Sequence, residues 1–139
     1  MARQFYIASD HAGLPLKEKL LELKNYNWKD LGTHTEASVD YPDFAHELAS
    51  AMKDDPDSMG VLVCGSGQGM AMAANEHKHI RAALCWNKEL ARLSREHNNA
   101  NVLCLGARVI DHDLALEIFS TFVHTEFEGG RHEKRVSKI

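Results

Sequence analysis

The chain has 139 residues, which is long enough to bury one sheet between helices and too short for two independent hydrophobic cores. We therefore expect a single domain over residues 1–139. Hydrophobic residues make up 44% of the chain and charged residues 26%, as in globular proteins. The net charge of -4 argues against a general binder of nucleic acid or of anionic membranes and favours a small-molecule ligand.

The apolar runs and the cysteines indicate a cellular compartment. No apolar run has the length of a secretory signal or of a membrane-spanning helix, so we expect a cytoplasmic protein with no membrane contact. The three cysteines, an odd number without close pairing, fit reduced thiols better than a disulfide framework.

Short β-rich runs alternate with amphipathic stretches, which is the pattern of βαβ units that build a parallel sheet. The first strand is predicted over residues 5–8. The helix after it carries leucines spaced for one helix face, namely Leu16, Leu20 and Leu23. A second strand is predicted over residues 28–31, and Pro42 can open the next helix.

The second half of the chain begins with an apolar strand over residues 60–63, followed by a glycine loop and a helix-forming segment over residues 70–74. Two further strands are predicted over residues 82–85 and 102–105, with a helix over residues 88–96 between them. A last long helix is marked by Leu114, Ile118 and Phe122. Five strands with helices between them predict an α/β fold.

The junction after the strand at residues 60–63 reads Cys64-Gly65-Ser66-Gly67-Gln68-Gly69. Ligands bind at the carboxyl ends of strands in open parallel sheets, and a glycine loop lets backbone amides approach an anion at a helix N-terminus. Such loops often hold phosphate, although many tight turns use glycine for steric reasons alone. A thiol in this position is favoured as the thiolate, so Cys64 is a candidate base or nucleophile.

The other two thiols have a simpler explanation. Cys85 and Cys104 fall inside predicted apolar strands, where a cysteine behaves as a small buried hydrophobic residue. We assign them no chemistry.

Two polar clusters are further candidates. Asp10 and His11 follow the first strand, where they either bind a ligand or satisfy free amides of the coming helix. His97 closes a helix, and a helix C-terminus favours imidazolium, so this residue is a candidate proton donor. Asn99, in the same polar stretch, is expected to adopt the left-handed conformation that ends many helices.

A fourth cluster is basic. Arg108 follows the last strand, and Arg131 and Arg135 stand four residues apart, on one face if the tail is helical. Guanidinium groups suit bidentate recognition of phosphate, and solvated surface charge is the alternative. The tail either is disordered or completes a site.

Metal and nucleotide sites are not predicted. His77 and His79 form the closest pair among nine histidines, but they lie in a polar stretch without a cysteine or carboxylate at ligand spacing, and we expect a solvated turn. The sequence lacks the G-x-x-x-x-G-K-[ST] motif of nucleotide hydrolysis, and it lacks the acidic residue about twenty positions after G-x-G-x-x-G that dinucleotide binding uses.

Several short motifs stand in the order typical of one family. They are Ser9-Asp10-His11-Ala12-Gly13, Asp40-Tyr41-Pro42-Asp43, Cys64-Gly65-Ser66-Gly67-Gln68-Gly69, His97-Asn98, Gly106-Ala107-Arg108 and Gly129-Gly130-Arg131-His132. This combination closely resembles ribose-5-phosphate isomerase type B over nearly the whole chain. The family also includes allose-6-phosphate and galactose-6-phosphate isomerases.

The resemblance implies a three-layer α/β/α Rossmann-like fold with a five-stranded parallel sheet. It implies a sugar phosphate as the small-molecule partner, a homodimer or dimer of dimers with active sites shared between subunits, and no metal or organic cofactor. The implied reaction interconverts ribose 5-phosphate and ribulose 5-phosphate through an enediolate, in the non-oxidative pentose phosphate pathway.

The resemblance also assigns roles to the candidate residues. Cys64 becomes the base at the sugar's C2, and His97 becomes the acid that opens the ring. The enediolate would lie against Ser66 and the backbone of Gly65, Gly67, Gln68 and Gly69. Sugar hydroxyls would lie against Asp10 and Asn98, and the phosphate against His11, Arg108, Arg131 and Arg135.

Two other functions stay open at this point. One is a hexose-6-phosphate isomerase of the same family, because nothing in the sequence fixes the depth of the pocket. The other is a non-catalytic flavodoxin-like module that only holds a phosphate-bearing ligand. Gln68 and Asn99 depart from the residues common in the family, and their effect on activity is not predicted.

Overall fold

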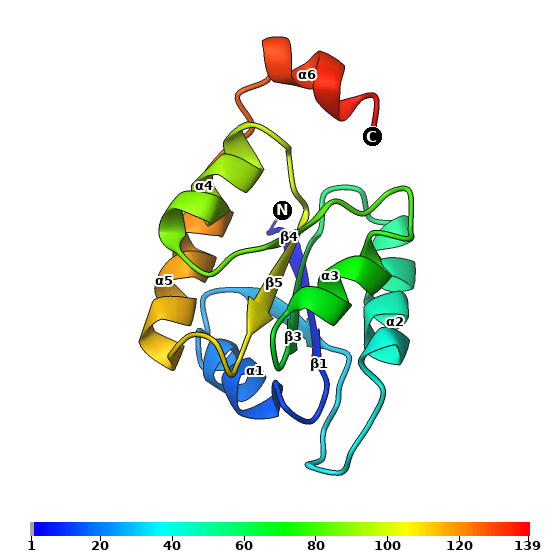
Figure 1. Ribbon diagram of the computed structural model, residues 1–139, viewed down its shortest axis with the longest axis vertical. Coiled ribbons are helices and arrows are strands. Elements are labelled where there is room, and N and C mark those ends of the chain that lie inside the picture. Colours follow the sequence, from blue (N-terminus) through cyan, green and yellow to red (C-terminus); the bar gives the residue numbers. More distant parts are fainter. Residues whose placement is uncertain (1) are drawn as a thin grey trace.

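The computed structural model describes residues 2–139, which form one five-stranded sheet with flanking helices (Figure 1). All strand pairs are parallel, in the order β2-β1-β3-β5-β4. The strands are β1 (Gln4–Ser9), β2 (Asn27–Asp30), β3 (Met59–Cys64), β4 (Ala82–Leu84) and β5 (Val102–Gly106). The helices are α1 (Leu14–Leu21), α2 (Tyr41–Lys53), α3 (Gln68–Ala74), α4 (Lys88–Glu96), α5 (His112–Val123) and α6 (Arg131–Val136). The predicted α/β fold with five parallel strands is confirmed.

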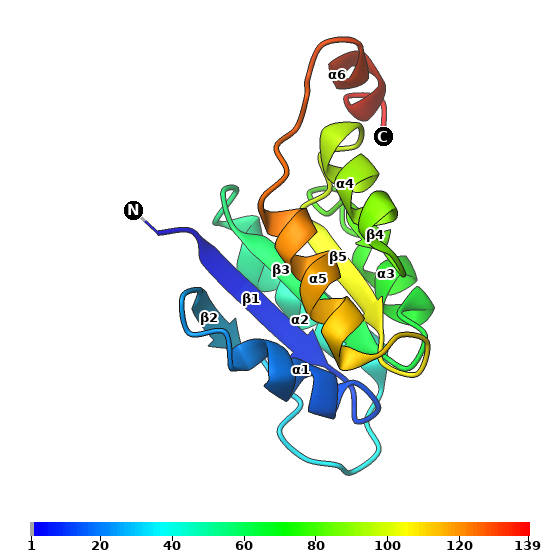
Figure 2. The ribbon, with the colours of Figure 1, turned by 90° about the vertical axis from the view of Figure 1, so that its left-hand side faces the viewer.

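Two helical layers cover the sheet. Helices α1, α4 and α5 lie on one face, and α2 and α3 lie on the other (Figure 2). Successive residues of a strand point to opposite faces, so Val61 and Val63 of β3 join the core under α1 and α5, whereas Leu62 joins the core under α2 and α3. All six residues of β3 are buried, as expected for a central parallel strand.

The helices begin where the local sequence favours a helix start. Pro15 and Pro42 lie in the first turns of α1 and α2, where the missing N–H is not needed. The Asn87 side chain accepts a hydrogen bond from the Leu90 N–H at 2.8 Å, and Asp111 caps α5 in the same way. Within residues 2–139, no helix combines the length and apolar character that crossing a membrane requires.

The basic tail forms the short helix α6. This helix lies beyond the amino ends of the strands, at the end of the molecule away from the strand arrowheads (Figures 1 and 2). The chain reaches it through Gly129 and Gly130, which have φ angles of +67° and +55° that favour glycine. Because the segment is helical, Arg131 and Arg135 share one face, as predicted.

Strand β4 is an edge of the sheet and has only three residues. A side chain occupies the outer hydrogen-bonding groups of its first residue: the Asn75 amide donates to the Ala82 carbonyl at 3.0 Å, and the Ala82 N–H donates to the Asn75 Oδ1 at 2.8 Å. The Asn75 amide therefore takes the place of a neighbouring strand. Cys85, predicted as the last strand residue, lies just past β4, and its amide still donates to the Cys104 carbonyl at 3.2 Å.

A buried ion pair ties α1 to the sheet. Lys17 of α1 is only 1% exposed, and its ammonium donates to Asp30 Oδ1 at 2.6 Å and to the Thr33 carbonyl at 2.7 Å. Asp30 Oδ1 also accepts from the Gly32 N–H at 2.9 Å. A buried ammonium is tolerated only when it is paired and hydrogen-bonded, so the position of α1 depends on Asp30.

We predict that Asp30→Ala lowers the free energy of unfolding by about 3 kcal/mol, because it leaves the Lys17 ammonium buried without its counter-ion. The double variant Lys17→Met with Asp30→Ala should return to within about 1 kcal/mol of the parent, since it removes both charges. Urea unfolding followed by circular dichroism measures both values.

A matched control is the exposed pair Lys19–Glu22, whose side chains are 41% and 66% accessible. Lys19→Ala should change the free energy of unfolding by less than about 0.5 kcal/mol. Equal losses for Asp30→Ala and for the double variant would contradict the assignment of the loss to a stranded charge.

Candidate active site

The sheet has a switch point between β1 and β3, where the chain changes the side on which it adds strands. Ligands bind in the crevice outside the carboxyl ends of the strands at such a point. Asp10 follows β1 and Cys64 ends β3, and the Asp10 N–H donates to the Val63 carbonyl at 3.2 Å. The topology therefore brings these two predicted residues to one crevice.

A cavity of about 410 Å³ opens at this crevice, a volume that suits a small molecule. Predicted site residues from β1, the glycine loop and the end of β5 line it, namely Asp10, Cys64, Gly65, Ser66, Gly69 and Arg108. Tyr41 and Val109 also line it, and neither was assigned a role from the sequence. Tyr41 stands in a motif that the family shares, which was the one signal for it.

The Cys64 thiol is 4% exposed, and its sulfur accepts a hydrogen bond from the Gly67 N–H at 3.2 Å. The Ser66 hydroxyl accepts from the Gln68 N–H at 3.3 Å. The sulfur therefore lies at the wall of the cavity with one backbone amide directed at it. A thiolate held at a cavity wall can act as a base toward a ligand in the cavity.

Two positions in the loop require glycine. Gly67 has a φ of +80°, which other residues rarely adopt. A Cβ on Gly69 would lie 2.4 Å from the Tyr41 ring, so this ring packs directly on the loop backbone. Steric reasons therefore require glycine at these two positions, and they are compatible with a chemical role for the loop.

Asp10 is buried, and its Oδ1 accepts a hydrogen bond from the Gly13 N–H at 3.0 Å. Because α1 begins at Leu14, Asp10 satisfies an amide of the turn before the helix, and it also lines the cavity. His11 accepts a hydrogen bond at Nδ1 from the Val39 N–H at 3.2 Å. An accepting Nδ1 puts the proton of a neutral imidazole on Nε2, which is then the donor that His11 can offer to a ligand.

Arg108 is the cation of this crevice. The backbone N–H of Arg108 donates to the Gly65 carbonyl at 2.9 Å, and the backbone N–H of the adjacent Ala107 donates to the Cys64 carbonyl at 2.9 Å. A Cβ on Gly65 would lie 3.0 Å from Arg108 Nη1, so the guanidinium lies over the glycine loop. Its exposed charge favours an anionic ligand.

The other predicted residues lie at the opposite end of the sheet. Helix α4 runs from the carboxyl end of β4 back to the amino end of β5, so its C-cap, His97, lies at the amino edge. A nine-residue helix is about 14 Å long, which separates His97 from the Cys64 crevice. A pairing of the His97 imidazole with the Cys64 thiolate does not form inside one chain.

His97 belongs to a second cluster at this amino edge. Its ring stacks on the ring of His132, with 4.2 Å between centroids and 15° between planes. Glu128 Oε1 lies 3.8 Å from His97 Nε2 and 3.4 Å from His132 Nε2. Sequence reasoning assigned no role to Glu128 or His132. The available signals were their spacing of four residues and the place of His132 in the motif Gly129-Gly130-Arg131-His132.

Three more predicted residues lie near this cluster along the chain. Arg131 and Arg135 are exposed on α6, and Asn98 is exposed next to His97. Asn99 has a φ of +48°, which confirms the left-handed conformation expected after α4. The candidate residues are thus divided between the two ends of the sheet, with the thiol and Arg108 at one end and His97 and the tail arginines at the other.

The prediction of a solvated turn at His77 and His79 was wrong in part. The segment is a turn, but both side chains are half-buried against α2. His79 Nε2 lies 2.7 Å from the Ala49 carbonyl, and His77 Nε2 lies 2.7 Å from His46 Nδ1. Burial, followed by the nearby His46 and His79, lowers the pKa of His77. A contact with a distant helix is not visible in local polarity.

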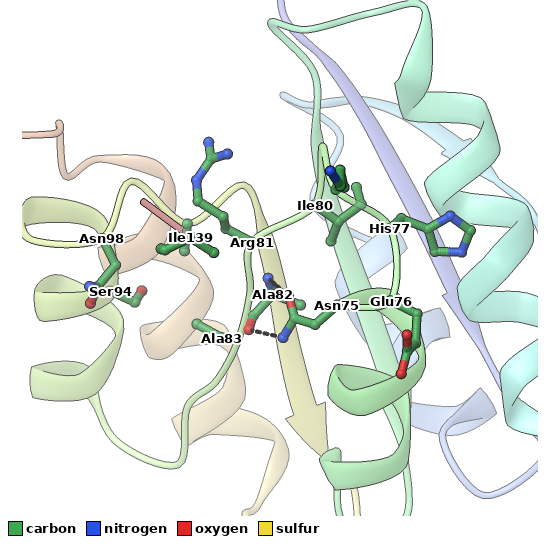
Figure 3. A pocket seen from close by; sticks show the side chains of 12 residues that line it. Asn75, Glu76, His77, Ile80, Arg81, Ala82, Ala83, Ser94, Asn98 and Ile139 are labelled. Atoms are coloured by element: carbon green, nitrogen blue, oxygen red, sulfur yellow. Dashed lines mark hydrogen bonds between the residues drawn. The ribbon is translucent and has the colours of Figure 1, made fainter. Parts of the chain in front are cut away.

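A larger hollow of about 440 Å³ lies beside the edge strand β4 (Figure 3). Asn75, Glu76 and His77 stand on one side of it, and Ser94, Asn98 and Ile139 stand on the other (Figure 3). Ala82 and Ala83 of β4 also line this hollow, and no thiol lines it. We therefore place the candidate chemistry in the smaller cavity at the switch point.

Comparison with known proteins identifies relatives over the full chain. Residues 5–139 match the family described as Ribose/Galactose Isomerase. The ribose-5-phosphate isomerase B of Escherichia coli is 38% identical over 133 residues, which cover 94% of this chain and 89% of that protein.

Solved structures agree with this match. The ribose 5-phosphate isomerase of Thermotoga maritima superposes with a TM-score of 0.95 at 47% identity, covering 99% of this chain and 97% of that chain. The ribose-5-phosphate isomerase B of Mycoplasma genitalium, solved with bound ribulose-5-phosphate, superposes with a TM-score of 0.93 at 43% identity, covering 99% of this chain and 94% of that chain.

The two remaining thiols differ from Cys64 in their surroundings. Burial raises the pKa of the Cys85 thiol to about 11, against a smaller opposing effect of Ser94. Burial also raises the pKa of Cys104 well above its usual range, with smaller contributions from Cys64 and Cys85. Both thiols are therefore protonated at neutral pH, in agreement with the inert role expected for them.

We predict that iodoacetamide at pH 8 labels Cys64 well before Cys85 and Cys104 in the folded protein. At that pH a thiol with a pKa of about 11 is only about one part in a thousand thiolate, and the thiolate is the reactive form. Mass spectrometry of tryptic peptides measures each rate. Labelling in guanidinium chloride, where all three should react, is the control, and labelling of Cys85 as fast as Cys64 in the folded state would contradict the prediction.

Proposed function

Because the chain belongs to the ribose/galactose isomerase family, we propose that it interconverts ribose 5-phosphate and ribulose 5-phosphate, with Cys64 as the base. The observation that carries the proposal is the Cys64 sulfur, held by the Gly67 amide at 3.2 Å in a cavity at the switch point of the sheet. The named relatives act on or bind these pentose phosphates, which favours them over a hexose phosphate.

The proton transfer follows from the position of the sulfur. The Cys64 thiolate takes the proton from C2 of the open-chain aldose, and the electrons of that bond form a C1–C2 double bond with negative charge on O1. A proton then passes from O2 to O1, and the Cys64 thiol returns its proton to C1, which leaves a C2 carbonyl. Atoms and charge balance, and no electrons are exchanged with a second reactant.

The charge that develops on the enediolate needs donors in the same cavity. The Ser66 hydroxyl and the backbone amides of Gly65, Gly67, Gln68 and Gly69 follow the sulfur in the chain up to the start of α3, and the Gly67 amide donates to it. One oxyanion donor contributes about 10² to 10³ in rate, and a positioned base about 10² to 10⁴. These contributions support a reaction that uses no metal and no organic cofactor.

A second subunit completes the site in this proposal. His97, Asn98, Arg131 and Arg135 lie at the opposite end of the sheet from Cys64 within one chain. A homodimer or a dimer of dimers brings the His97 end of one chain to the Cys64 crevice of another. Large apolar side chains that are exposed on helices α2 and α3 and on the loops after β4 and β5 support such an interface, namely Tyr41, Met72, Trp86 and Val109.

The shared site divides the work between the two chains. His97 of one chain protonates the ring oxygen and opens the furanose, and Asn98 contacts a sugar hydroxyl together with Asp10 of the other chain. Arg108 and His11 approach the phosphate from the crevice, and Arg131 and Arg135 approach it from the partner's α6. Bidentate guanidinium contacts suit a phosphate dianion. Three reduced cysteines fit an enzyme of the cytoplasm.

We predict that purified protein converts ribose 5-phosphate to ribulose 5-phosphate with the same rate before and after treatment with EDTA. Cys64→Ala should lower kcat by about 10² to 10⁴ while substrate binding, measured by calorimetry, stays within threefold. Cys85→Ala is the control for removing a thiol without removing the base, and it should retain near-normal turnover.

The outcomes separate the alternatives. Faster turnover of allose 6-phosphate or galactose 6-phosphate would replace the pentose assignment with a hexose assignment. Binding of a sugar phosphate without any isomerisation would favour the non-catalytic module. Near-normal turnover of Cys64→Ala would remove this residue from the role of base.

The shared site predicts a specific result when two inactive variants are mixed. In a dimer of Cys64→Ala with His97→Asn, one site carries both substitutions and the other carries none. After subunit exchange at equal concentrations half of the dimers are hybrids, so about a quarter of the wild-type activity should return.

Sites built within one chain would give a different result. Each chain would then carry one defect in its own site, and mixing would restore no activity. Size-exclusion chromatography with light scattering shows whether hybrids can form, and two samples of the same variant mixed together are the control for spontaneous recovery.

A further inference from the structure

The cluster of His97, Glu128 and His132 offers the donor atoms of a metal site. Among residues 2–139 it is the one group of three such side chains whose ligand atoms all lie within 4.8 Å of one another. We infer that this cluster binds a zinc-class divalent cation and that the bound cation stops the ring-opening step. The inhibitory effect rests on the proposed function, whereas the binding does not.

The distances are close to those of a tetrahedral site. Zinc bonds to imidazole nitrogen and carboxylate oxygen are about 2.0–2.1 Å long, so neighbouring ligand atoms are about 3.3 Å apart. Glu128 Oε1 lies 3.4 Å from His132 Nε2 and 3.8 Å from His97 Nε2. The two distances to Glu128 Oε1 therefore lie within about half an ångström of the tetrahedral value, and the two imidazole nitrogens lie within 4.8 Å of each other.

The side chains differ in their freedom to move. The His132 side chain is buried, and the backbone N–H of His132 donates to the Gly129 carbonyl at 3.1 Å. Glu128 is held through its backbone, because its N–H donates to the Glu96 carbonyl at 3.1 Å. The His97 side chain is 39% exposed. The two rings are nearly parallel, so the His97 ring has to turn for both nitrogens to face one cation.

The donor set selects the class of cation. Two imidazoles and one carboxylate are the ligands of catalytic zinc sites, which leave a fourth position open. Calcium and magnesium prefer sites made of oxygen ligands only. The Glu128 side chain is 51% exposed within one chain, and among residues 2–139 no fourth donor of the same chain joins the cluster.

The local charge sets the strength of binding. Glu128 carries one negative charge, and Arg131 and Arg135 of the neighbouring helix carry two positive charges, which oppose a cation. We expect micromolar rather than nanomolar affinity for this reason. A phosphate bound to the two arginines would remove part of that opposition.

The effect on catalysis follows from the atoms involved. A metal ion takes the lone pair of His97 Nε2, and that nitrogen can then neither bind nor release a proton. The bound cation would block ring opening of the aldose. The linear ketose needs no ring opening, and Cys64 is not among the donors of the cluster, so enolisation of the linear ketose should continue.

A second histidine pair on the surface supplies the matched control. His46 Nδ1 and His77 Nε2 lie 2.7 Å apart on the α2 side of the molecule, far along the chain from α6. The pair contributes two imidazoles, and no third donor lies within 4.8 Å of both among residues 2–139. His46→Asn removes this pair and leaves the cluster at His97 intact.

The binding experiment titrates zinc chloride into metal-free protein by calorimetry. We expect one ion per chain with micromolar affinity, unchanged by His46→Asn. Glu128→Gln and His132→Asn each remove a ligand, so each should weaken binding by more than the about 10- to 100-fold that loss of an outer-shell partner costs. Circular dichroism checks that each variant is folded. Loss of binding in His46→Asn, or unchanged binding in both cluster variants, would overturn the assignment.

The activity experiment uses the same zinc concentrations. Zinc should slow conversion of ribose 5-phosphate at least about tenfold, because a positioned acid contributes about 10² to 10⁴ in rate, while deuterium exchange from solvent into linear ribulose 5-phosphate changes less than twofold. Equal loss of both activities would place the ion on the Cys64 thiol and overturn the assignment. A protein that binds zinc at the cluster but never isomerises ribose 5-phosphate would refute the proposed function alone.

Discussion

The hydrogen bond from the Gly67 amide to the Cys64 sulfur depends on most of the fold. It forms only where β3 ends, the chain turns through a glycine with positive φ, and α3 begins within a few residues. Neighbouring elements hold this turn from two sides, because residues after β5 bond to the carbonyls of Cys64 and Gly65, and the Tyr41 ring packs on Gly69. A central buried strand thus fixes the position of the Cys64 sulfur at its end.

The direction of the strands explains why the candidate residues are divided. In a parallel sheet every crossover helix returns the chain to the amino edge, so residues after a strand and residues after a helix lie at opposite ends. Cys64 and Arg108 follow strands, whereas His97 follows a helix. In the proposed dimer a second copy brings the two ends together, and substrate binding becomes sensitive to how the subunits pack.

Much of the fold could be predicted from the sequence, because the signals are local. The apolar run of β3, the periodic leucines of α1 and the cap at Asn87 each act within one element. The Cys64 loop was found for the same reason, since strand, glycines and helix are contiguous. The family resemblance, and not spacing, supplied the reaction and the partner subunit.

The residues that the sequence did not reveal depend on contacts between distant segments. His77 looks solvated by its neighbours but meets His46 of α2. Glu128 and His132 gain their place only when α6 folds against the end of α4. Tyr41 reaches the cavity because α2 lies next to α3. Local polarity and periodicity carry no information on such pairings.

The hydrogen bonds from the Asn75 side chain to the edge strand β4 affect how the protein behaves in concentrated solution. An uncovered strand at the rim of a sheet is a template onto which another polypeptide can add, and repeated addition leads to fibrils. By bonding both outer groups of Ala82, this one side chain occupies one of the few places on the three-residue rim where a foreign strand could bond. The length of rim that can act as a template is therefore shortened.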